Sequence, residues 1–153
     1  MQIKDESTHD KQLMHLAIEI AKTGNSRFGC VIAEKQEVIV KAFNTIKTGS
    51  DPTAHAEINA IRKLAEIPDC QDKKLTLYTT GEPCPMCMTA IMYAGIDRVV
   101  FGLSISEISK FMKQIKINAQ EIVDKGFKKV EITGGVLHEE CLNLFQTQYY
   151  DKR

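Results

Sequence analysis

Three side chains with the chemistry of metal ligands stand in two short motifs of the chain. His55 lies in Thr-Ala-His-Ala-Glu (residues 53–57), and Cys84 and Cys87 lie in Pro-Cys-Pro-Met-Cys (residues 83–87). One imidazole and two thiolates suit Zn²⁺, which structural sites almost always bind with four protein ligands and catalytic sites with three plus a water. Because three ligands leave one position open, the sequence predicts a catalytic zinc site, with one Zn²⁺ per subunit.

A carboxylate follows the histidine two residues later. Glu57 is close enough in sequence to reach a water molecule bound to such a zinc ion, whose pKa the metal lowers toward about 7. A carboxylate can act as base and then as acid within one turnover, so the sequence predicts that Glu57 moves the proton of a hydrolytic reaction. The alternative for Cys84 and Cys87 is a redox pair, but the neighbouring His-x-Glu motif favours the metal.

Both motifs are expected at the beginnings of helices. Asp51-Pro52 is typical of a helix start, with Asp as N-cap and Pro at the first helical position, and residues 54–65 then read as continuous helix. Pro85 opens another helix, and Cys84 and Cys87 share one face of its first turn. The positive ends of two helix dipoles are therefore predicted to converge on the metal and to favour anionic ligands.

Hydrophobic patterning predicts the elements that must hold these helices in place. Runs rich in β-branched and aromatic residues predict strands at residues 28–33, 38–43, 75–80, 98–102 and 128–133. Helical spacing of apolar residues predicts helices at residues 12–22, 104–115 and 136–149. This order of elements predicts an α/β fold, a three-layer α/β/α sandwich around a mixed five-stranded sheet, in a single domain of residues 1–153. A helical crossover makes the last two strands parallel.

Composition and charge limit the class of protein. The chain is 43% hydrophobic and 26% charged, which is ordinary for a soluble globular enzyme. Its formal net charge of zero argues weakly against a nucleic-acid partner, since phosphate binding normally leaves a basic footprint. No stretch approaches the ~18 apolar residues that span a membrane, and residues 1–11 lack the apolar core of a signal peptide. Five cysteines, an odd number, argue against a disulfide framework, so we expect a cytoplasmic protein with no membrane partner.

The motifs and their surroundings resemble the cytidine deaminase superfamily, and within it the branch of guanine deaminases and tRNA adenosine deaminases. The similar residues are Asn44 and the strings at residues 51–57, 82–87 and 97–102, and the resemblance covers roughly residues 12–145. It implies a cytidine deaminase-like fold, Zn²⁺ held by His55, Cys84 and Cys87, and Glu57 as the proton shuttle. It also implies a homodimer or higher oligomer with the pocket near a subunit boundary.

The resemblance implies where a base would bind. Asn44 looks like the residue that hydrogen-bonds the base, and the alternative is an Asn that caps a turn. Phe28 stands in a Phe-Gly segment similar to that of guanine deaminases, where its ring would pack on a purine, and the alternative is a core residue. Ala56 and Pro83 complete the expected substrate contacts. The aromatic tail at residues 149–151 would close the pocket, or else is a loosely packed terminus.

The substrate stays open between two purines. The Phe-Gly segment and the aromatic tail favour a small free purine base or nucleoside, guanine or guanosine first, with release of ammonia. Residues 130–141 look more like the C-terminus of tRNA-type enzymes, and the acidic-aromatic stretch of guanine deaminases has no counterpart between residues 104 and 125. The alternatives are deamination of adenosine to inosine in tRNA and a non-catalytic zinc-stabilised binding module. The lysines at 110, 113 and 116 are expected on a solvated helix face, with an RNA-contacting patch as the alternative.

Overall fold

The computed structural model describes residues 2–147, and their side chains from residue 7 onward. Helix α1 (Gln2–Thr23) precedes a hairpin of β1 (Gly29–Glu34) and β2 (Glu37–Phe43). The remaining elements, in chain order, are α2 (Ile46–Gly49), α3 (Ala56–Ala65), β3 (Thr76–Gly81), α4 (Pro85–Tyr93), β4 (Arg98–Leu103), α5 (Ile105–Ile108), α6 (Ala119–Asp124), β5 (Glu131–Thr133) and α7 (His138–Gln146).

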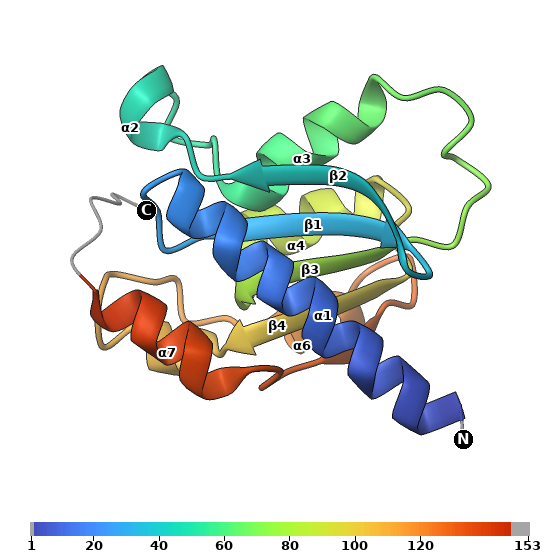
Figure 1. The fold of residues 1–153 in the computed structure, drawn as a ribbon. Coiled ribbons are helices and arrows are strands. Elements are labelled where there is room, and N and C mark those ends of the chain that lie inside the picture. The colour runs from blue at the N-terminus through green and yellow to red at the C-terminus, as the bar shows by residue number, and fades with distance from the viewer. Residues whose placement is uncertain (1, 148–153) are drawn as a thin grey trace.

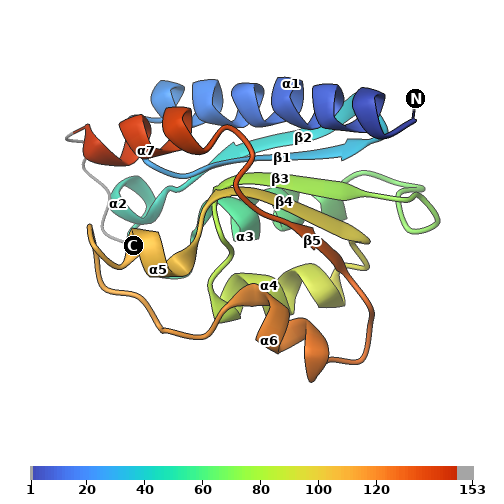
Figure 2. The same cartoon turned by 90° about the horizontal axis from the view of Figure 1, so that it is seen from below.

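The five strands form one mixed sheet in the order β2-β1-β3-β4-β5. Strand β1 is antiparallel to both β2 and β3, whereas β3, β4 and β5 are parallel to one another. Helices α1 and α7 cover one face of the sheet, and α3, α4 and α6 cover the other (Figure 2). The predicted three-layer α/β/α sandwich with a mixed five-stranded sheet is confirmed, including the parallel pairing of the last two strands. The single-domain organisation stays a prediction.

Helix α1 lies along the sheet and is fastened to it in two ways (Figure 1). Its inward face buries an apolar stripe, which consists of Leu13, Met14, Ala17, Ile18 and Ala21. The Asp10 carboxylate accepts two hydrogen bonds from the guanidinium of Arg98 on β4, at 2.8 and 2.7 Å, and a third from the hydroxyl of Tyr78 on β3. The helix starts at Gln2, ten residues before the predicted start at residue 12, because the mostly polar residues 2–11 show no apolar stripe in the sequence. It ends at Thr23, one residue after the predicted end, with Asn25 in the left-handed region (φ 52°) and the Ser26 N–H donating to the Ala21 carbonyl.

The connection from β4 to β5 differs from the prediction of a helix over residues 104–115. The capping box of Ser104 and Glu107 is present, but α5 ends at Ile108, and residues 109–118 contain no helix. A second capping box, formed by Asn118 and Glu121, starts α6, which is the crossover helix that lies under the sheet. Helical spacing predicted this segment wrongly: Phe111 and Met112 pack against the core without a helix, and Ile115 is 61% exposed.

Two further boundaries differ from the predicted ones. Strand β5 spans three residues rather than six, because its pairing with β4 extends only over residues 98–100. Helix α7 begins at His138 rather than at residue 136, because Leu137 adopts a left-handed conformation (φ 51°) that cannot continue into a helix. The aromatic tail at residues 149–151 lies outside the described residues. No helix among the described residues is long and apolar enough to cross a membrane.

Candidate active site

The three predicted metal ligands meet at one point. The ligand atoms of His55, Cys84 and Cys87 all lie within 4.8 Å of one another, and His55 Nδ1 is 3.6 Å from Cys84 Sγ and 3.4 Å from Cys87 Sγ. A tetrahedral zinc ion with Zn–S bonds of about 2.3 Å and a Zn–N bond of about 2.0 Å holds its nitrogen and sulfur ligands about 3.6 Å apart. The donor set and its spacing therefore fit zinc, and these three residues are positioned to bind one ion.

Two helix N-termini bring the ligands together. His55 is the N-cap of α3 and Cys84 is the N-cap of α4, with Pro85 at the first helical position. Neither cap residue uses its side chain to accept a hydrogen bond from its own helix. The two side chains meet each other instead, with His55 Nδ1 3.6 Å from Cys84 Sγ. The positive dipole ends of α3 and α4 favour the anionic thiolates.

The predicted start of α3 at Asp51 was wrong. The Asp51 carboxylate accepts hydrogen bonds from the backbone and the hydroxyl of Thr53, at 2.9 and 2.7 Å, and pairs with Arg62. The two hydrogen bonds from Thr53, followed by that from Arg62, lower the pKa of Asp51 to about 2. Asp51 therefore stabilises a turn ahead of the helix, and the helix starts four residues later than an Asp N-cap would place it.

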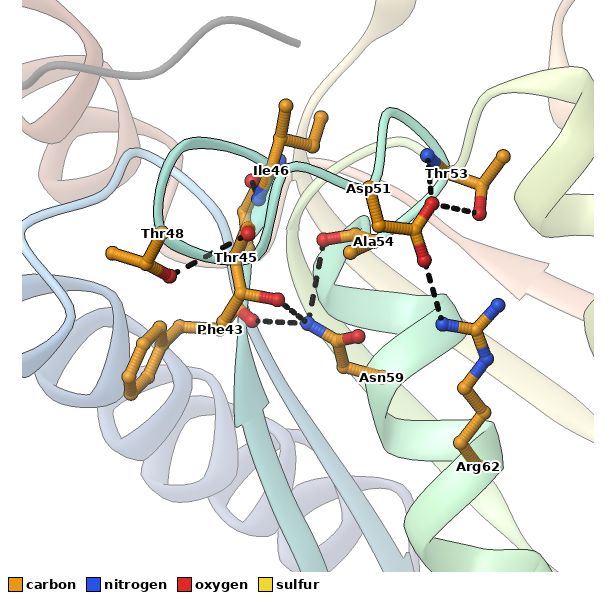
Figure 3. Close-up of polar contacts among 10 residues, drawn as sticks. Phe43, Thr45, Ile46, Thr48, Asp51, Thr53, Ala54, Asn59 and Arg62 are labelled. Atoms are coloured by element: carbon orange, nitrogen blue, oxygen red, sulfur yellow. Dashed lines mark hydrogen bonds and ion pairs between the residues drawn. The ribbon is translucent and has the colours of Figure 1, made fainter.

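The loop between β2 and α3 is held by a residue that the sequence did not single out. The side-chain amide of Asn59 donates to Phe43 O, Thr45 Oγ1 and Ala54 O at 2.9, 2.8 and 3.3 Å (Figure 3). These acceptors lie at both ends of the loop, next to Asn44 and His55. One feature of the sequence pointed to this residue. Asn has a low helix propensity, so an Asn inside a predicted helix suggests that its side chain makes a specific contact.

Glu57 lies in the first turn of α3 and is completely buried. The hydroxyl of Thr79 on β3, also completely buried, is 3.2 Å from Glu57 Oε1. A carboxylate in this position is costly to bury unless it is hydrogen-bonded. Thr79 is a second residue that sequence analysis missed, because a threonine in a strand is ordinary.

Asn44 follows β2 and is 8% exposed. Its Oδ1 accepts a hydrogen bond from the backbone N–H of Ile46, as a turn-capping Asn would. Its Nδ2 is buried and has no hydrogen-bond partner among the described residues. The side-chain oxygen of Asn44 therefore caps a turn, as the alternative prediction had it. The side-chain NH2 group can still donate a hydrogen bond to another group.

The other expected substrate contacts lie close to the ligands in sequence or deep in the core. Ala56 is completely buried at the first position of α3, and Pro83 is buried just before Cys84. Phe28 is completely buried and packs edge to face on Phe145, with the ring centroids 5.1 Å apart. This arrangement is that of a core residue, which was the alternative for Phe28. Stacking of Phe28 on a purine stays a prediction, and the packing on Phe145 does not favour it.

Glu82, beside Pro83, anchors the segment that follows β4. Its two carboxylate oxygens accept the backbone N–H groups of Ile105 and Ala119, at 2.8 and 2.7 Å. These two residues are the first of α5 and α6. The buried Glu82 side chain thus joins the first residues of both helices to the segment of residues 83–87, which carries the two cysteine ligands.

The remaining cysteines are not part of the metal group. Cys30, Cys70 and Cys141 are buried and form no disulfide within the described part of the chain. Burial raises the pKa of the Cys141 thiol to about 12, so this group stays protonated at neutral pH.

The three-ligand metal group has the composition of a catalytic rather than a structural zinc site. The family model described as the cytidine and deoxycytidylate deaminase zinc-binding region matches residues 7–103, so the chain belongs to the cytidine deaminase superfamily. This match confirms the predicted family and, with the geometry, the predicted zinc cofactor.

Individual relatives differ in substrate. The tRNA-specific adenosine deaminase of Buchnera aphidicola subsp. Baizongia pistaciae is 37% identical over 94% of this chain and 90% of its own length. The guanine deaminase of Bacillus subtilis is 40% identical, over 64% of each chain. The solved structure of guanine deaminase from Nitrosomonas europaea superposes with a TM-score of 0.71 and 19% identity, covering 92% of this chain and 81% of its own. At that identity the last likeness shows the fold alone.

Proposed function

We propose that this protein hydrolytically deaminates a purine base. The observation that carries the proposal is a metal group with three protein ligands and a completely buried carboxylate, Glu57, two residues from the histidine. A purely structural zinc site uses four protein ligands and has no need of a carboxylate beside it. The non-catalytic binding module is therefore the weakest of the three alternatives.

Glu57 provides the proton transfers of the proposed reaction. When bound, zinc polarises a water molecule and lowers the pKa of that water toward about 7. Glu57 accepts the proton as the water attacks the amino-bearing ring carbon, and delivers it to the adjacent ring nitrogen. Glu57 then takes the second proton, from the hydroxyl that the attack has placed on this carbon, and passes it to the amine, which leaves as ammonia while the carbon–oxygen double bond forms. The buried position of Glu57 keeps bulk water from competing for these protons.

Asn44 is the proposed base-binding residue. Its buried Nδ2 lacks a partner among the described residues, and a buried donor without a partner costs about 1–3 kcal/mol. An acceptor atom on the base would satisfy it. Because Oδ1 is held by Ile46 N–H, the amide cannot turn over freely, so Asn44 presents a fixed donor.

Adenosine in tRNA becomes the first candidate substrate. The tRNA-specific relatives from the two Buchnera strains and Haemophilus influenzae are 30–37% identical over 94–98% of this chain, whereas the guanine deaminase match covers 64%. Figure 2 shows α2, α5 and residues 109–118 at the end of the sheet where β3 and β4 finish, which is the end that carries the metal ligands. Exposed lysines lie in these segments, namely Lys47, Lys110, Lys113 and Lys116. They could contact RNA phosphates even though the net charge is zero.

Guanine or guanosine is the second candidate. The zero net charge favours a small substrate. The identity to a guanine deaminase is 40%, which exceeds the 37% identity to a tRNA-specific relative, although the match covers only 64% of the chain. Both candidates use the same metal group and the same Glu57. They differ in which ring carbon carries the amino group and in whether a polyanion must bind.

One panel separates the candidates. Zinc-loaded protein is incubated with guanine, guanosine, adenine, cytosine and cytidine, with ammonia as readout, and with a tRNA anticodon stem-loop, with inosine as readout, at low and high salt. Inosine formation that falls steeply with salt supports the first candidate, and salt-independent turnover of guanine or guanosine supports the second. Glu57→Ala is the inactive control. Stoichiometric zinc with no activity on any substrate would overturn the deaminase proposal and revive the binding module.

A further inference from the structure

The buried hydroxyl of Thr79 lies on the helix side of the central strand. Residues alternate between the two faces of a strand, so Thr79 faces away from Tyr78, whose hydroxyl bonds to Asp10 on α1. Thr79 therefore points into the layer that contains α3 and α4. Its neighbour on the same face, Leu77, is apolar and completely buried.

The hydroxyl is not required for packing at this position. Valine has nearly the same shape and an equal preference for strands, and it would avoid the cost of burying a polar group. Two acceptors compensate that cost, namely Glu57 Oε1 and Gly81 O, each 3.2 Å from Thr79 Oγ1. A hydroxyl has only one proton to donate, and a charged acceptor makes the stronger bond, so Glu57 is the preferred acceptor.

The two ends of this hydrogen bond are anchored differently. Thr79 lies in β3, which pairs with β1 on one side and β4 on the other, so its backbone is fixed from both directions. Glu57 lies on the first turn of α3, at the end of a flexible side chain. The strand therefore fixes one carboxylate oxygen, and with it the orientation of the whole planar group.

We propose that Thr79 is a positioning residue of this deaminase, whose hydroxyl holds the Glu57 carboxylate in the orientation that proton transfer requires. This proposal rests on the proposed role of Glu57. Thr79 does not touch the substrate, so its loss should slow turnover without weakening substrate binding. A misplacement of reacting groups by about 1 Å can cost about 100-fold in rate.

The test compares Thr79→Val, Thr79→Ser and Thr76→Val in the zinc-loaded protein. Thr76 is half-buried on the same strand, and Thr76→Val controls for the loss of a hydroxyl from β3. We expect Thr79→Val to keep its zinc content and lower kcat by about 10- to 100-fold with KM within about 2-fold of wild type. Thr79→Ser should recover most of kcat, and Thr76→Val should match wild type. If Thr79→Val does not fold, Thr79→Ala takes its place.

A second readout needs no substrate. In protein loaded with Co²⁺ instead of Zn²⁺, the visible absorption band reports the surroundings of the open coordination position. We expect Thr79→Val to shift this band in the same direction as Glu57→Gln, while Thr76→Val leaves it unchanged. If the wild type deaminates nothing, the proposed function fails, and the cobalt band still decides whether the Thr79 hydroxyl orients the Glu57 carboxylate.

Two results would overturn the positioning role. One is wild-type kcat and an unchanged cobalt band in Thr79→Val. The other is a loss of kcat that Thr79→Ser does not restore and that accompanies a lower unfolding temperature, which would assign Thr79 to the fold.

Discussion

At the scale of single residues, the proposed function assigns metal ligation and proton transfer to different side chains. His55, Cys84 and Cys87 offer one nitrogen and two sulfur atoms at zinc-ligand spacing. Glu57, two residues after His55 in the first turn of α3, is not one of the three. This division means that the two functions can be removed independently by mutation.

Replacing Glu57 by Gln should abolish activity without removing the metal. The amide has nearly the same volume and can still bond to the Thr79 hydroxyl, but it cannot accept a proton. We expect zinc content and unfolding temperature close to wild type and a fall in turnover of about 10²–10⁴-fold. Near-normal turnover would refute the proton-shuttle role.

Replacing Cys87 by Ser should remove the metal. A thiolate is a far better zinc ligand than a hydroxyl, so we expect substoichiometric zinc by elemental analysis, a lower unfolding temperature and no activity. Cys70→Ser is the matched control, since Cys70 is also buried but lies outside the metal group. Equal zinc content in the two variants would contradict the proposed ligand set.

At the scale of elements, the segment beside the site is held by polar contacts. Glu82 fixes the first residues of α5 and α6, and Glu107 in α5 contacts His138, the first residue of α7. Hydrogen bonds that His138 donates to the carboxylates of Glu107 and Glu139 raise the pKa of His138. Burial alone would raise the pKa of Glu107, but the hydrogen bonds from His138 and Ser104 outweigh it and lower that pKa.

The contact between α5 and α7 should stabilise the fold within a limited pH window. A raised His138 pKa gives stability that is complete below the ordinary value of 6.5 and is lost as pH rises through the folded-state value. A lowered Glu107 pKa gives stability that is complete above the ordinary value of 4.5 and is lost as pH falls through the folded-state value.

The free energy of unfolding of wild type should therefore exceed that of His138→Gln most between about pH 4.5 and 6.5. Urea unfolding at pH 5.5 and pH 8.5 measures this difference. The control is His15→Gln, which removes an exposed histidine of α1. A difference between wild type and His138→Gln that is the same at both pH values would show that the contact does not depend on the charge of His138.

At the scale of the whole molecule, an aromatic pair is exposed on the side of the sheet that carries α4 and α6. Tyr93, at the end of α4, is 76% exposed and Phe127, after α6, is 68% exposed, with their ring centroids 5.1 Å apart. Exposed aromatic side chains that lie together are typical of protein interfaces. This pair is a candidate part of the homodimer contact expected from the resemblance.

Replacing both Tyr93 and Phe127 by Glu should therefore weaken self-association. We expect sedimentation velocity to show wild type as a dimer and the double variant shifted toward monomer, because two buried charges per subunit oppose association. Gln36→Glu, at the exposed tip of the β1–β2 hairpin, is the control. A dimer of unchanged strength would place the contact elsewhere.

Local sequence determined much of this protein. The metal group, the start of α4 and the α/β/α architecture follow from residue type, short spacing and periodicity, because each depends on neighbours a few positions apart. The role of Glu57 as proton shuttle stays a prediction from the same local pattern. Local signals failed where competing partners decided the outcome. Asp51 has the residue type of an N-cap, but its carboxylate bonds to Thr53 and Arg62 instead of to the start of a helix. The apolar spacing of residues 104–115 predicted one helix, but α5 ends at Ile108.

Only the tertiary structure decided which distant residues support the site. Thr79 reaches Glu57 across 22 positions, Glu82 reaches Ala119 across 37, and Asn59 joins both ends of the loop that carries Asn44 and leads to His55. Likewise, Phe28 had the residue type of a stacking platform, but its ring packs on Phe145, which is far away in sequence. Such pairings depend on how the sheet and helices stack, and residue spacing along the chain carries no information about that.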